Sequence, residues 1–183
     1  MSEAGHRTLA IRTAGPADIE TIRRIYAHHV LEGSASFEEV PPDGDELERR
    51  RRDVVARGLP YLVAIKDDAI VGYAYLTPYR PRSAYRFTVE DSIYLAPGRE
   101  RQGIGGRLLA DLIDTATALG MRQMLAVIGD SANRGSIELH ARYGFVHAGI
   151  FRSVGFKHGG WLDSVLMQRA LGPGDTTLPI ERR

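Results

Sequence analysis

Three glycines occur within four residues of the stretch ERQGIGGRLL (100–109), directly after a β-rich segment and directly before an apolar segment with helical spacing. The β-rich segment is FTVEDSIYL (87–95), the helix is expected over about 103–119, and a continuous apolar run, MLAVIG (124–129), follows it. Strand, turn, helix and strand in this order form a crossover unit, in which the two strands are parallel and the connection is right-handed. The chain is therefore expected to fold as an α/β domain.

The rest of the chain predicts a mostly antiparallel set of strands and further amphipathic helices. Strands are expected at 8–13, 61–66, 70–76, 145–151 and 161–171, and helices from Pro16 and Asp18 onward, at 43–57 and at 133–143. A tight hairpin is predicted at Asp67-Asp68-Ala69. The length of 183 residues fits one domain, taken as 1–171, and the Pro- and Gly-rich segment 172–183 is expected to be a frayed tail.

Composition excludes several classes of function. The chain carries 24 basic and 23 acidic residues, so no overall field draws it to nucleic acid or to an anionic membrane. It has no cysteine, which excludes disulfides and a cysteine nucleophile and suits the cytoplasm. No apolar run reaches the about 18 residues of a membrane helix, and no cluster has metal-ligand spacing, so neither a membrane nor a metal is expected. The basic run in ERRRRD (48–53) lies beside acidic residues, which is typical of a solvated helix face.

The glycines Gly103, Gly105 and Gly106 predict a phosphate-binding turn. A helix N-terminus leaves about four backbone N–H groups unpaired and carries the positive end of the helix dipole. Because glycine has no Cβ, an anion can approach the backbone closely there. A Walker loop requires Gly-Lys and then Ser or Thr, whereas this chain has Gly106-Arg107-Leu108. A dinucleotide-binding turn normally follows the first strand of its domain, and this turn follows the fourth.

These residues resemble the coenzyme A signature of the Gcn5-related N-acetyltransferase (GNAT) superfamily. SIYLAPGRERQGIGGRLL (92–109) is similar to the family's Arg/Gln-x-x-Gly-x-Gly/Ala pattern after the fourth strand, and NRGSIELHARYGF (133–145) is similar to its second motif. YRPRSAYRFTVEDSIYL (79–95) and GFKHGGWLD (155–163) resemble the phosphinothricin and methionine sulfoximine acetyltransferase branch. Glu100 stands where the pattern has Arg or Gln, and we expect it to point away from a bound pyrophosphate.

The resemblance covers about residues 8–171 and implies the GNAT fold, a mixed sheet of about seven strands with four flanking helices. It implies acetyl-CoA as co-substrate and a homodimer, and the cytoplasmic location stays the expectation from the absence of cysteine. The coenzyme-binding residues that it implies are Ile93, Tyr94, Leu95, Arg101, Gln102, Gly103, Ile104, Gly105, Gly106, Asn133 and Ser136. Within this set, the backbone N–H of Leu95 is the candidate donor to the oxyanion of the tetrahedral intermediate.

The resemblance also implies which groups move protons. An amino-acid ammonium group is mostly protonated at pH 7, so it must lose a proton before it can attack a thioester. Strand alternation in TVED places Glu90 and Asp91 on opposite faces, and Glu90 matches the family's general base. Asp91 is the weaker candidate and is open to a purely structural interpretation. For the acid that protonates the departing thiolate, the candidates are His140 and, in reserve, Tyr143.

The resemblance finally implies an acceptor with acidic groups. Forked guanidinium groups suit the carboxylate and the phosphinate or sulfoximine oxygens of a small amino acid. The implied acceptor-binding residues are Phe37, Tyr79, Arg80, Arg82, Tyr85, Arg86, Lys157 and His158. The leading prediction is an enzyme, an N-acetyltransferase that acts on the amino group of such a molecule by direct transfer in a ternary complex.

Two alternatives stay open at this point. The same fold could acetylate a polyamine, an aminoglycoside or a protein N-terminus, although the arginines of 80–86 argue against a cationic amine. The chain could instead be a non-catalytic coenzyme sensor, or a nucleic-acid-binding module that uses the arginines of 49–52.

Overall fold

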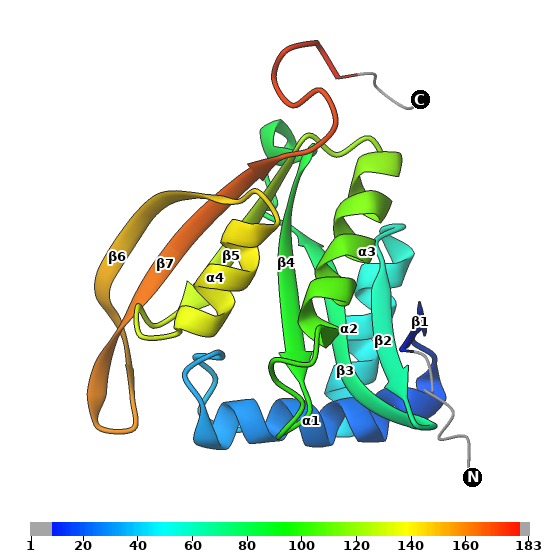
Figure 1. Cartoon of the computed structure of the whole chain (residues 1–183), viewed down its shortest axis with the longest axis vertical. Helices are drawn as coiled ribbons and strands as arrows, with labels where there is room; N and C mark the ends of the chain where they lie inside the picture. Colours follow the sequence, from blue (N-terminus) through cyan, green and yellow to red (C-terminus); the bar gives the residue numbers. More distant parts are fainter. Residues whose placement is uncertain (1–8, 180–183) are drawn as a thin grey trace, which may run out of the picture.

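The computed structural model describes residues 9–179, and within them seven strands form one sheet in the order β1-β2-β3-β4-β5-β7-β6 (Figure 1). The strands are β1 Ala10–Thr13, β2 Tyr61–Lys66, β3 Ala69–Pro78, β4 Thr88–Leu95, β5 Gln123–Gly129, β6 Val146–Lys157 and β7 Gly160–Ala170. The four α-helices of this part of the chain are α1 Ile19–Glu32, α2 Gly44–Ala56, α3 Ile104–Ala118 and α4 Arg134–Arg142. The predicted mixed sheet with four flanking helices is confirmed.

The predicted crossover unit lies at the centre of this sheet. β4 and β5 pair in parallel and are joined through α3, whereas every other neighbouring pair is antiparallel. The hairpin between β2 and β3 is also as predicted. Asp67 and Asp68 have φ angles of 54° and 60°, the left-handed values that a tight two-residue hairpin turn requires.

The last hairpin is longer than the sequence pattern predicts. The segment after residue 151 was expected to be a connection, but β6 continues through it to Lys157 and pairs with β7 beyond an irregularity between Phe151 and Gly155. Ser153, with a φ of 52°, marks this interruption. A bulge of this kind breaks the two-residue alternation on which the prediction of a strand depends, so the periodicity ends before the strand does. The predicted strand residue Thr8 lies outside the described residues.

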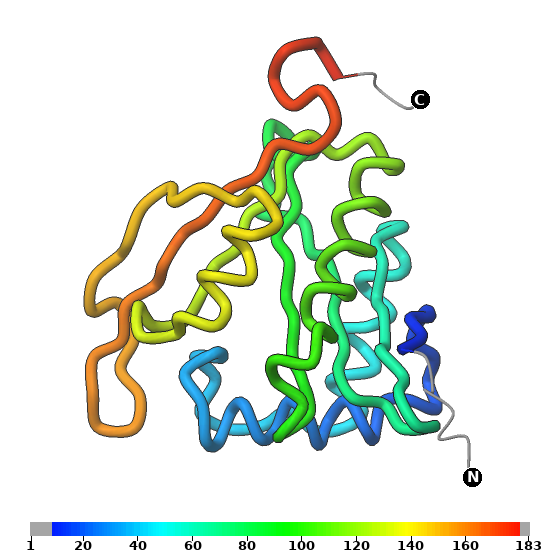
Figure 2. The backbone as a smooth tube through the Cα atoms, viewed as in Figure 1, coloured from blue at the N-terminus to red at the C-terminus, as the bar shows by residue number. Residues whose placement is uncertain are grey.

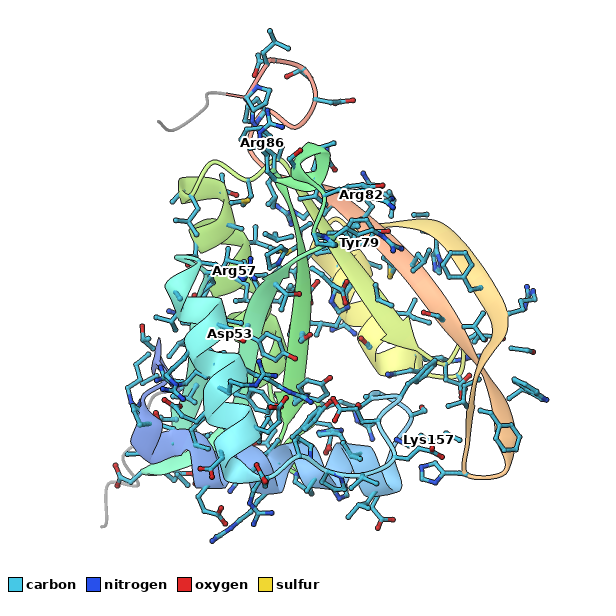
Figure 3. The ribbon with its side chains drawn as sticks, turned by 180° about the vertical axis from the view of Figure 1, so that it is seen from behind. Asp53, Arg57, Tyr79, Arg82, Arg86 and Lys157 are labelled. Atoms are coloured by element: carbon cyan, nitrogen blue, oxygen red, sulfur yellow. The ribbon has the colours of Figure 1, made fainter. Side chains whose placement is uncertain are left out.

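Strand alternation gives the sheet two different faces. The face toward α3 is aliphatic, and Leu108, Leu109 and Leu112 of that helix are fully buried against it. The face toward α1 and α2 carries tyrosines, and the rings of Tyr61 and Tyr75 stack with their centroids 4.9 Å apart. Figure 1 shows α3 and α4 in front of the sheet, and Figure 3, from behind, shows α2 over the other face.

A buried lysine joins the C-terminal hairpin to the loop between α1 and α2. The Lys157 ammonium group donates hydrogen bonds to the carbonyl oxygens of Gly33, at 2.8 Å, and Ser36, at 2.6 Å. The Phe37 ring lies where a Cβ on Gly155 would be, so glycine is needed at that position. Figure 2 shows the loop after α1 and the far end of the hairpin on the same side of the molecule. The loop is therefore held by an element more than 100 residues away in the sequence.

The described part of the C-terminal segment, 172–179, follows β7 in a series of turns. Arg122 donates hydrogen bonds to the carbonyl oxygens of Gly174 and Leu178, both at 2.9 Å. The boundary of the domain at 171 and the frayed tail stay predictions, and residues 180–183 lie outside the described part of the chain.

Gly129, at the end of β5, provides a test of the packing around the loop between α1 and α2. A Cβ on Gly129 would overlap the carbonyl oxygen of Ser34, and a backbone atom cannot move aside as a flexible side chain can. Gly129→Ala should therefore lower the free energy of unfolding by about 1–3 kcal/mol. Gly135→Ala is the matched control, because a Cβ on Gly135 meets nothing within 4 Å. Urea denaturation of both variants tests this, and equal stability of the two would contradict the packing argument.

Candidate active site

The two central strands separate before they end, and the separation opens a cavity. The ladder between β4 and β5 stops at Asp91 and Ala126, although the strands continue to Leu95 and Gly129. A cavity of about 550 Å³ lies there, bounded by both strands and by the first turns of α3 and α4. We call it the splay cavity. Backbone groups of β4 that face β5 beyond Asp91 have no strand partner in this ladder, so they are available to a ligand.

The glycine turn forms one wall of the splay cavity. Gly103 is the residue before α3 and has a φ of 80°, a left-handed value that suits glycine. Gly106 has a further role, since a Cβ there would lie 2.8 Å from the hydroxyl oxygen of Tyr143. A Cβ on Gly105 would lie 3.3 Å from Cδ2 of Leu139. The absence of side chains at 105 and 106 thus also allows α4 and Tyr143 to approach α3. This packing is a second reason for glycine at both positions, and the sequence analysis did not consider it.

Most of the predicted coenzyme-binding residues line the splay cavity. They are Ile93, Tyr94, Leu95, Arg101, Gly103, Gly105, Gly106, Asn133 and Ser136. Gln102 and Ile104 do not line it, because Gln102 hydrogen-bonds to Lys66 and Ile104 is buried in the core. Glu100 also lines the cavity, and its orientation away from a bound pyrophosphate stays a prediction. The coenzyme-binding role of each residue stays a prediction.

His140 and Asp91, which the sequence analysis did not connect, form a buried pair in the wall of the splay cavity. His140 Nε2 lies 2.9 Å from Oδ2 of Asp91, and His140 Nδ1 lies 2.8 Å from the carbonyl oxygen of Ser136. Both side chains are at most 5% exposed. The other carboxylate oxygen of Asp91, Oδ1, is buried without a hydrogen-bond partner among the described residues.

The partners of His140 determine where its protons are. A carbonyl oxygen only accepts, so Nδ1 carries a proton, and the Nε2–Asp91 contact then contains one further proton shared by the two side chains. Burial by itself lowers the pKa of His140. The hydrogen bond that the ring donates to Asp91 and the negative charge of Asp91 outweigh burial, so the pKa is raised above its ordinary value of 6.5. The pair is therefore a buried store of one proton beside the cavity.

Glu90 lies on the other face of β4, as predicted. It is half-buried and pairs across the sheet with Thr77 of β3. Burial raises the pKa of Glu90, the negative charge of Asp91 raises it further, and Arg80 opposes both effects. A carboxylate whose pKa is moved toward neutrality is better suited to accept and return a proton at physiological pH.

His29 of α1 is a residue of the splay cavity that the sequence analysis missed. Its Nε2 lies 2.8 Å from the carbonyl oxygen of Leu95, and burial lowers its pKa, so the neutral ring donates this hydrogen bond. It fixes the last residue of β4, whose N–H is the candidate oxyanion donor. No motif marks His29, because the contact joins residues 66 positions apart in the sequence.

The predicted acceptor-binding residues do not form one cluster. Tyr79 and Arg80 line a second cavity, of about 390 Å³, between α2 and β3, whereas Arg82, Tyr85 and Arg86 do not line it. Arg86 lies over the Phe87 ring, with its guanidinium carbon 4.8 Å from the ring centroid. In Figure 3, Arg86 and Lys157 are at opposite ends of the molecule.

Phe37, Lys157 and His158 belong to the contact between the hairpin and the loop. Lys157 is buried with its ammonium group committed to two carbonyl oxygens, and Phe37 packs against Gly129 and Gly155. His158 Nε2 is 3.4 Å from the carbonyl oxygen of Gly33. None of the three lines either cavity in this chain, and their roles toward an acceptor stay predictions.

The basic run of α2 is paired with acidic residues, and it is solvated as predicted except at Arg51, which is buried. Arg49 pairs with Glu46 and Asp53, Arg50 with Glu38 and Glu46, and Arg51 with Glu48, at N–O distances of 2.6–2.8 Å. Arg52 lies 3.7 Å from Glu48. A surface whose cations are already paired offers little charge to phosphate groups.

Comparison with known proteins agrees with this geometry. The model of the acetyltransferase (GNAT) family matches residues 23–145. The chain belongs to the GNAT family. It is 56% identical over 169 residues to the phosphinothricin N-acetyltransferase of Alcaligenes faecalis, covering 92% of this chain and 86% of that protein. It is 41% identical over 169 residues to the L-methionine sulfoximine/L-methionine sulfone acetyltransferase of Pseudomonas aeruginosa, covering 90% of this chain and 95% of that one.

A solved structure extends the likeness to three dimensions. The chain matches a GNAT phosphinothricin acetyltransferase from Sinorhizobium meliloti in complex with acetyl-CoA, with a TM-score of 0.92 and 47% identity. The match covers 95% of this chain and 94% of the other. The predicted family and its phosphinothricin branch are confirmed, and this GNAT protein is an N-acetyltransferase.

Two negative findings apply to the described residues. In 9–179 no group of three or more His, Cys, Asp or Glu is placed to hold a metal ion. The same part of the chain contains no helix with the length and apolar character needed to cross a membrane.

The Asp91–His140 pair predicts the titration of His140. The pKa of the His140 ring should lie above 6.5 in the wild type. It should lie below 6.5 in Asp91→Asn, where burial, the largest effect, is opposed by the weaker effect of the hydrogen bond to the Ser136 carbonyl. Because the folded-state pKa is raised, the pair stabilises the fold fully below about pH 6.5, and this contribution is lost as pH rises through the folded-state pKa. NMR titration of the histidine rings, with the signal assigned by its absence in His140→Gln, measures both values. A pKa unaffected by Asp91→Asn would contradict the shared proton.

Proposed function

We propose that the protein is an acetyl-CoA-dependent N-acetyltransferase that acetylates the amino group of an amino acid of the phosphinothricin or methionine sulfoximine type. The observation that carries the proposal is the splay cavity, which has the glycine turn at one end and lies along β4, the strand that bears Glu90. The names of the relatives at 56% and 41% identity, and the acetyl-CoA in the Sinorhizobium meliloti structure, support the choice of donor and acceptor.

The residues of the splay cavity fit coenzyme A. The unpaired N–H groups at the start of α3, with Arg101 beside them, suit a pyrophosphate, and the parted edge of β4 suits the amide-containing arm of the coenzyme. Asn133 caps α4 by accepting a hydrogen bond from the Ser136 N–H, which places both residues at the cavity wall. When bound, acetyl-CoA would supply an acyl group activated as a thioester.

Glu90 is the proposed general base. It removes a proton from the acceptor's ammonium group, directly or through a water, and the free amine then adds to the acetyl carbonyl carbon to give a tetrahedral intermediate. As the carbon–sulfur bond breaks, the nitrogen loses its second proton, which balances the proton that the departing thiolate takes up. The Leu95 N–H is the proposed donor to the oxyanion. Transfer is proposed to be direct, in a ternary complex, and the absence of cysteine from the sequence is consistent with this.

His140 is the proposed acid for the departing thiolate. It holds a proton in the shared contact with Asp91, and releasing that proton leaves a neutral ring beside a carboxylate. Tyr143 stays the alternative acid. Its hydroxyl lies over Gly106 in the glycine turn, a position that favours contact with the coenzyme instead.

Other acceptors remain a second candidate, on the evidence of the sequence alone, and the names of the relatives favour an amino acid. The nucleic-acid module is disfavoured by the paired arginines of α2. We also propose a cytoplasmic homodimer. Trp161 is 68% exposed and Phe156 is 58% exposed on the C-terminal hairpin, and such an apolar surface suits contact with a second copy.

A thiol-release assay with acetyl-CoA tests the function. Phosphinothricin and methionine sulfoximine should release coenzyme A, while polyamines should not. Glu90→Gln should lower kcat by roughly a hundredfold with the affinity for acetyl-CoA near that of wild type, because only the proton acceptor is lost. Unchanged turnover in this variant would remove Glu90 from the mechanism, and release with none of the amino acids would contradict the proposed acceptor.

Substitution in the glycine turn tests the coenzyme site. Gly105→Val should weaken the binding of acetyl-CoA at least about tenfold, because a branched side chain fills the cavity wall and presses on Leu139. Gly44→Ala, also in the first turn of a helix, is the control and should bind normally, since its Cβ makes only an ordinary contact. Isothermal titration calorimetry that found wild-type affinity in Gly105→Val would exclude the glycine turn as the coenzyme site.

A further inference from the structure

The cavity between α2 and β3, which we call the tyrosine cavity, has a lining that the proposed acceptors do not explain. Five of the eight tyrosines of the chain line its volume of about 390 Å³: Tyr26, Tyr61, Tyr73, Tyr75 and Tyr79. Leu47 and Val54 of α2 form the apolar wall opposite β3. Figure 3 looks onto this face, with Asp53 and Arg57 on α2 and Tyr79 beyond the end of β3.

The tyrosine rings form an ordered stack. The ring planes of Tyr61 and Tyr73 are within 8° of parallel, with centroids 6.0 Å apart, and Tyr73 and Tyr75 are within 12°, at 6.2 Å. Strand alternation causes this, because the three side chains project from paired positions on one face of β2 and β3. A further ring can pack against such a group in an offset or edge-on arrangement.

Two hydroxyl groups in this cavity lack a protein partner. Tyr61 and Tyr73 are 2% and 1% exposed, yet no hydrogen bond to either hydroxyl exists within residues 9–179. Among the described residues, Oδ1 of Asp91 is the one side-chain polar atom that is both inaccessible and without a hydrogen-bond partner. The two tyrosine hydroxyls have no partner but are not in that class, so they are accessible from the cavity. Burial raises the pKa of both tyrosines, which keeps the hydroxyls protonated and able to donate.

The charged groups around the cavity are not equivalent. Arg50 is neutralised by Glu38 and Glu46, and Asp53 pairs with Arg49. Arg80, at the rim, has no carboxylate partner within 4 Å among the described residues. The accessible chemistry is thus aromatic and hydroxylic inside, and cationic at the rim.

The tyrosine cavity adjoins the proposed base. Thr77, which lines the cavity, is the cross-strand partner of Glu90, and such partners have Cβ atoms about 4.5–5.5 Å apart on the same face. Arg80 is close enough to Glu90 to affect its pKa. An amino acid whose amine is at Glu90 can therefore place its carboxylate at Arg80 and its side chain against the tyrosines.

On the basis of the proposed function, we propose that the tyrosine cavity receives the acceptor's side chain and makes aromatic amino acids, above all L-tyrosine, acceptors of this enzyme. The cavity volume is within the range of pockets that enclose whole small ligands, so it accommodates a side chain larger than that of methionine sulfoximine. The free hydroxyls of Tyr61 and Tyr73 favour a side chain that ends in a hydrogen-bonding group, because an apolar end leaves them unpaired.

Three measurements of kcat/KM test the proposal, with L-tyrosine, L-phenylalanine and L-methionine sulfoximine as acceptors. The wild type should acetylate L-tyrosine, and roughly threefold to tenfold better than L-phenylalanine, the gain expected from one hydrogen bond. Val54→Phe fills the cavity, so kcat/KM for L-tyrosine divided by kcat/KM for methionine sulfoximine should fall at least about tenfold. Val55→Phe, one residue on and exposed, is the control and should keep the wild-type ratio.

Tyr73→Phe keeps the ring and removes one hydroxyl, so it should bring the ratio of L-tyrosine to L-phenylalanine toward one even if Val54→Phe fails to fold. Wild-type turnover of methionine sulfoximine without turnover of L-tyrosine would overturn the inference and leave the proposed function standing. The inference would also be overturned if Val54→Phe left the kcat/KM ratio of L-tyrosine to methionine sulfoximine unchanged and Tyr73→Phe left that of L-tyrosine to L-phenylalanine unchanged. No turnover of any amino acid would overturn both proposals together.

Discussion

The separation of β4 from β5 is the constraint on which the rest of this structure depends. Parallel strands normally pair along their length, but here the ladder stops after Asp91 and Ala126. Backbone groups left without partners in a protein interior are unfavourable unless water or a ligand satisfies them. The splay cavity therefore exists because the sheet leaves part of one strand edge open, and the elements around it hold that opening. His29 fixes Leu95 from α1, and the loop held by Lys157 packs against the end of β5.

Charge in this region is balanced between two adjacent carboxylates. Asp91 is compensated by His140, which lets an anion exist where its side chain is 2% exposed. Glu90 has no such partner within residues 9–179, and burial together with the charge of Asp91 raises its pKa. The pKa of Glu90 is thus set by burial and by its neighbours. Removing the charge of Asp91 would also change the pKa of Glu90, so the two carboxylates cannot be treated as independent sites.

Local pattern predicted the order of the elements well, because the glycine turn, the apolar run of β5 and the Asp67-Asp68 turn each act within a few residues. The end of β6 was missed because a bulge breaks the alternation. The Asp91–His140 and His29–Leu95 contacts join residues 49 and 66 positions apart, and no single-sequence period encodes such distances. Lys157 and Phe37 were assigned to an acceptor from their motifs alone. A motif cannot reveal that Lys157 contacts the loop after α1, or that Phe37 of that loop packs against Gly155 of β6, because each contact joins residues more than 100 positions apart.

The two-residue repeat of β4 also separates the proposed chemistry. Asp91, with its stored proton, faces α4 and the splay cavity, whereas Glu90 faces the side of α1 and α2, where the tyrosines lie. Asp91, which shares the proton of the proposed donor His140, and Glu90, the proposed proton acceptor from the amine, are therefore kept on opposite faces of one strand, although they are neighbours in sequence. A slip of one residue in the register of β4 would exchange them. The long antiparallel pairing of β4 with β3, from Val89 to Leu95, is what holds that register.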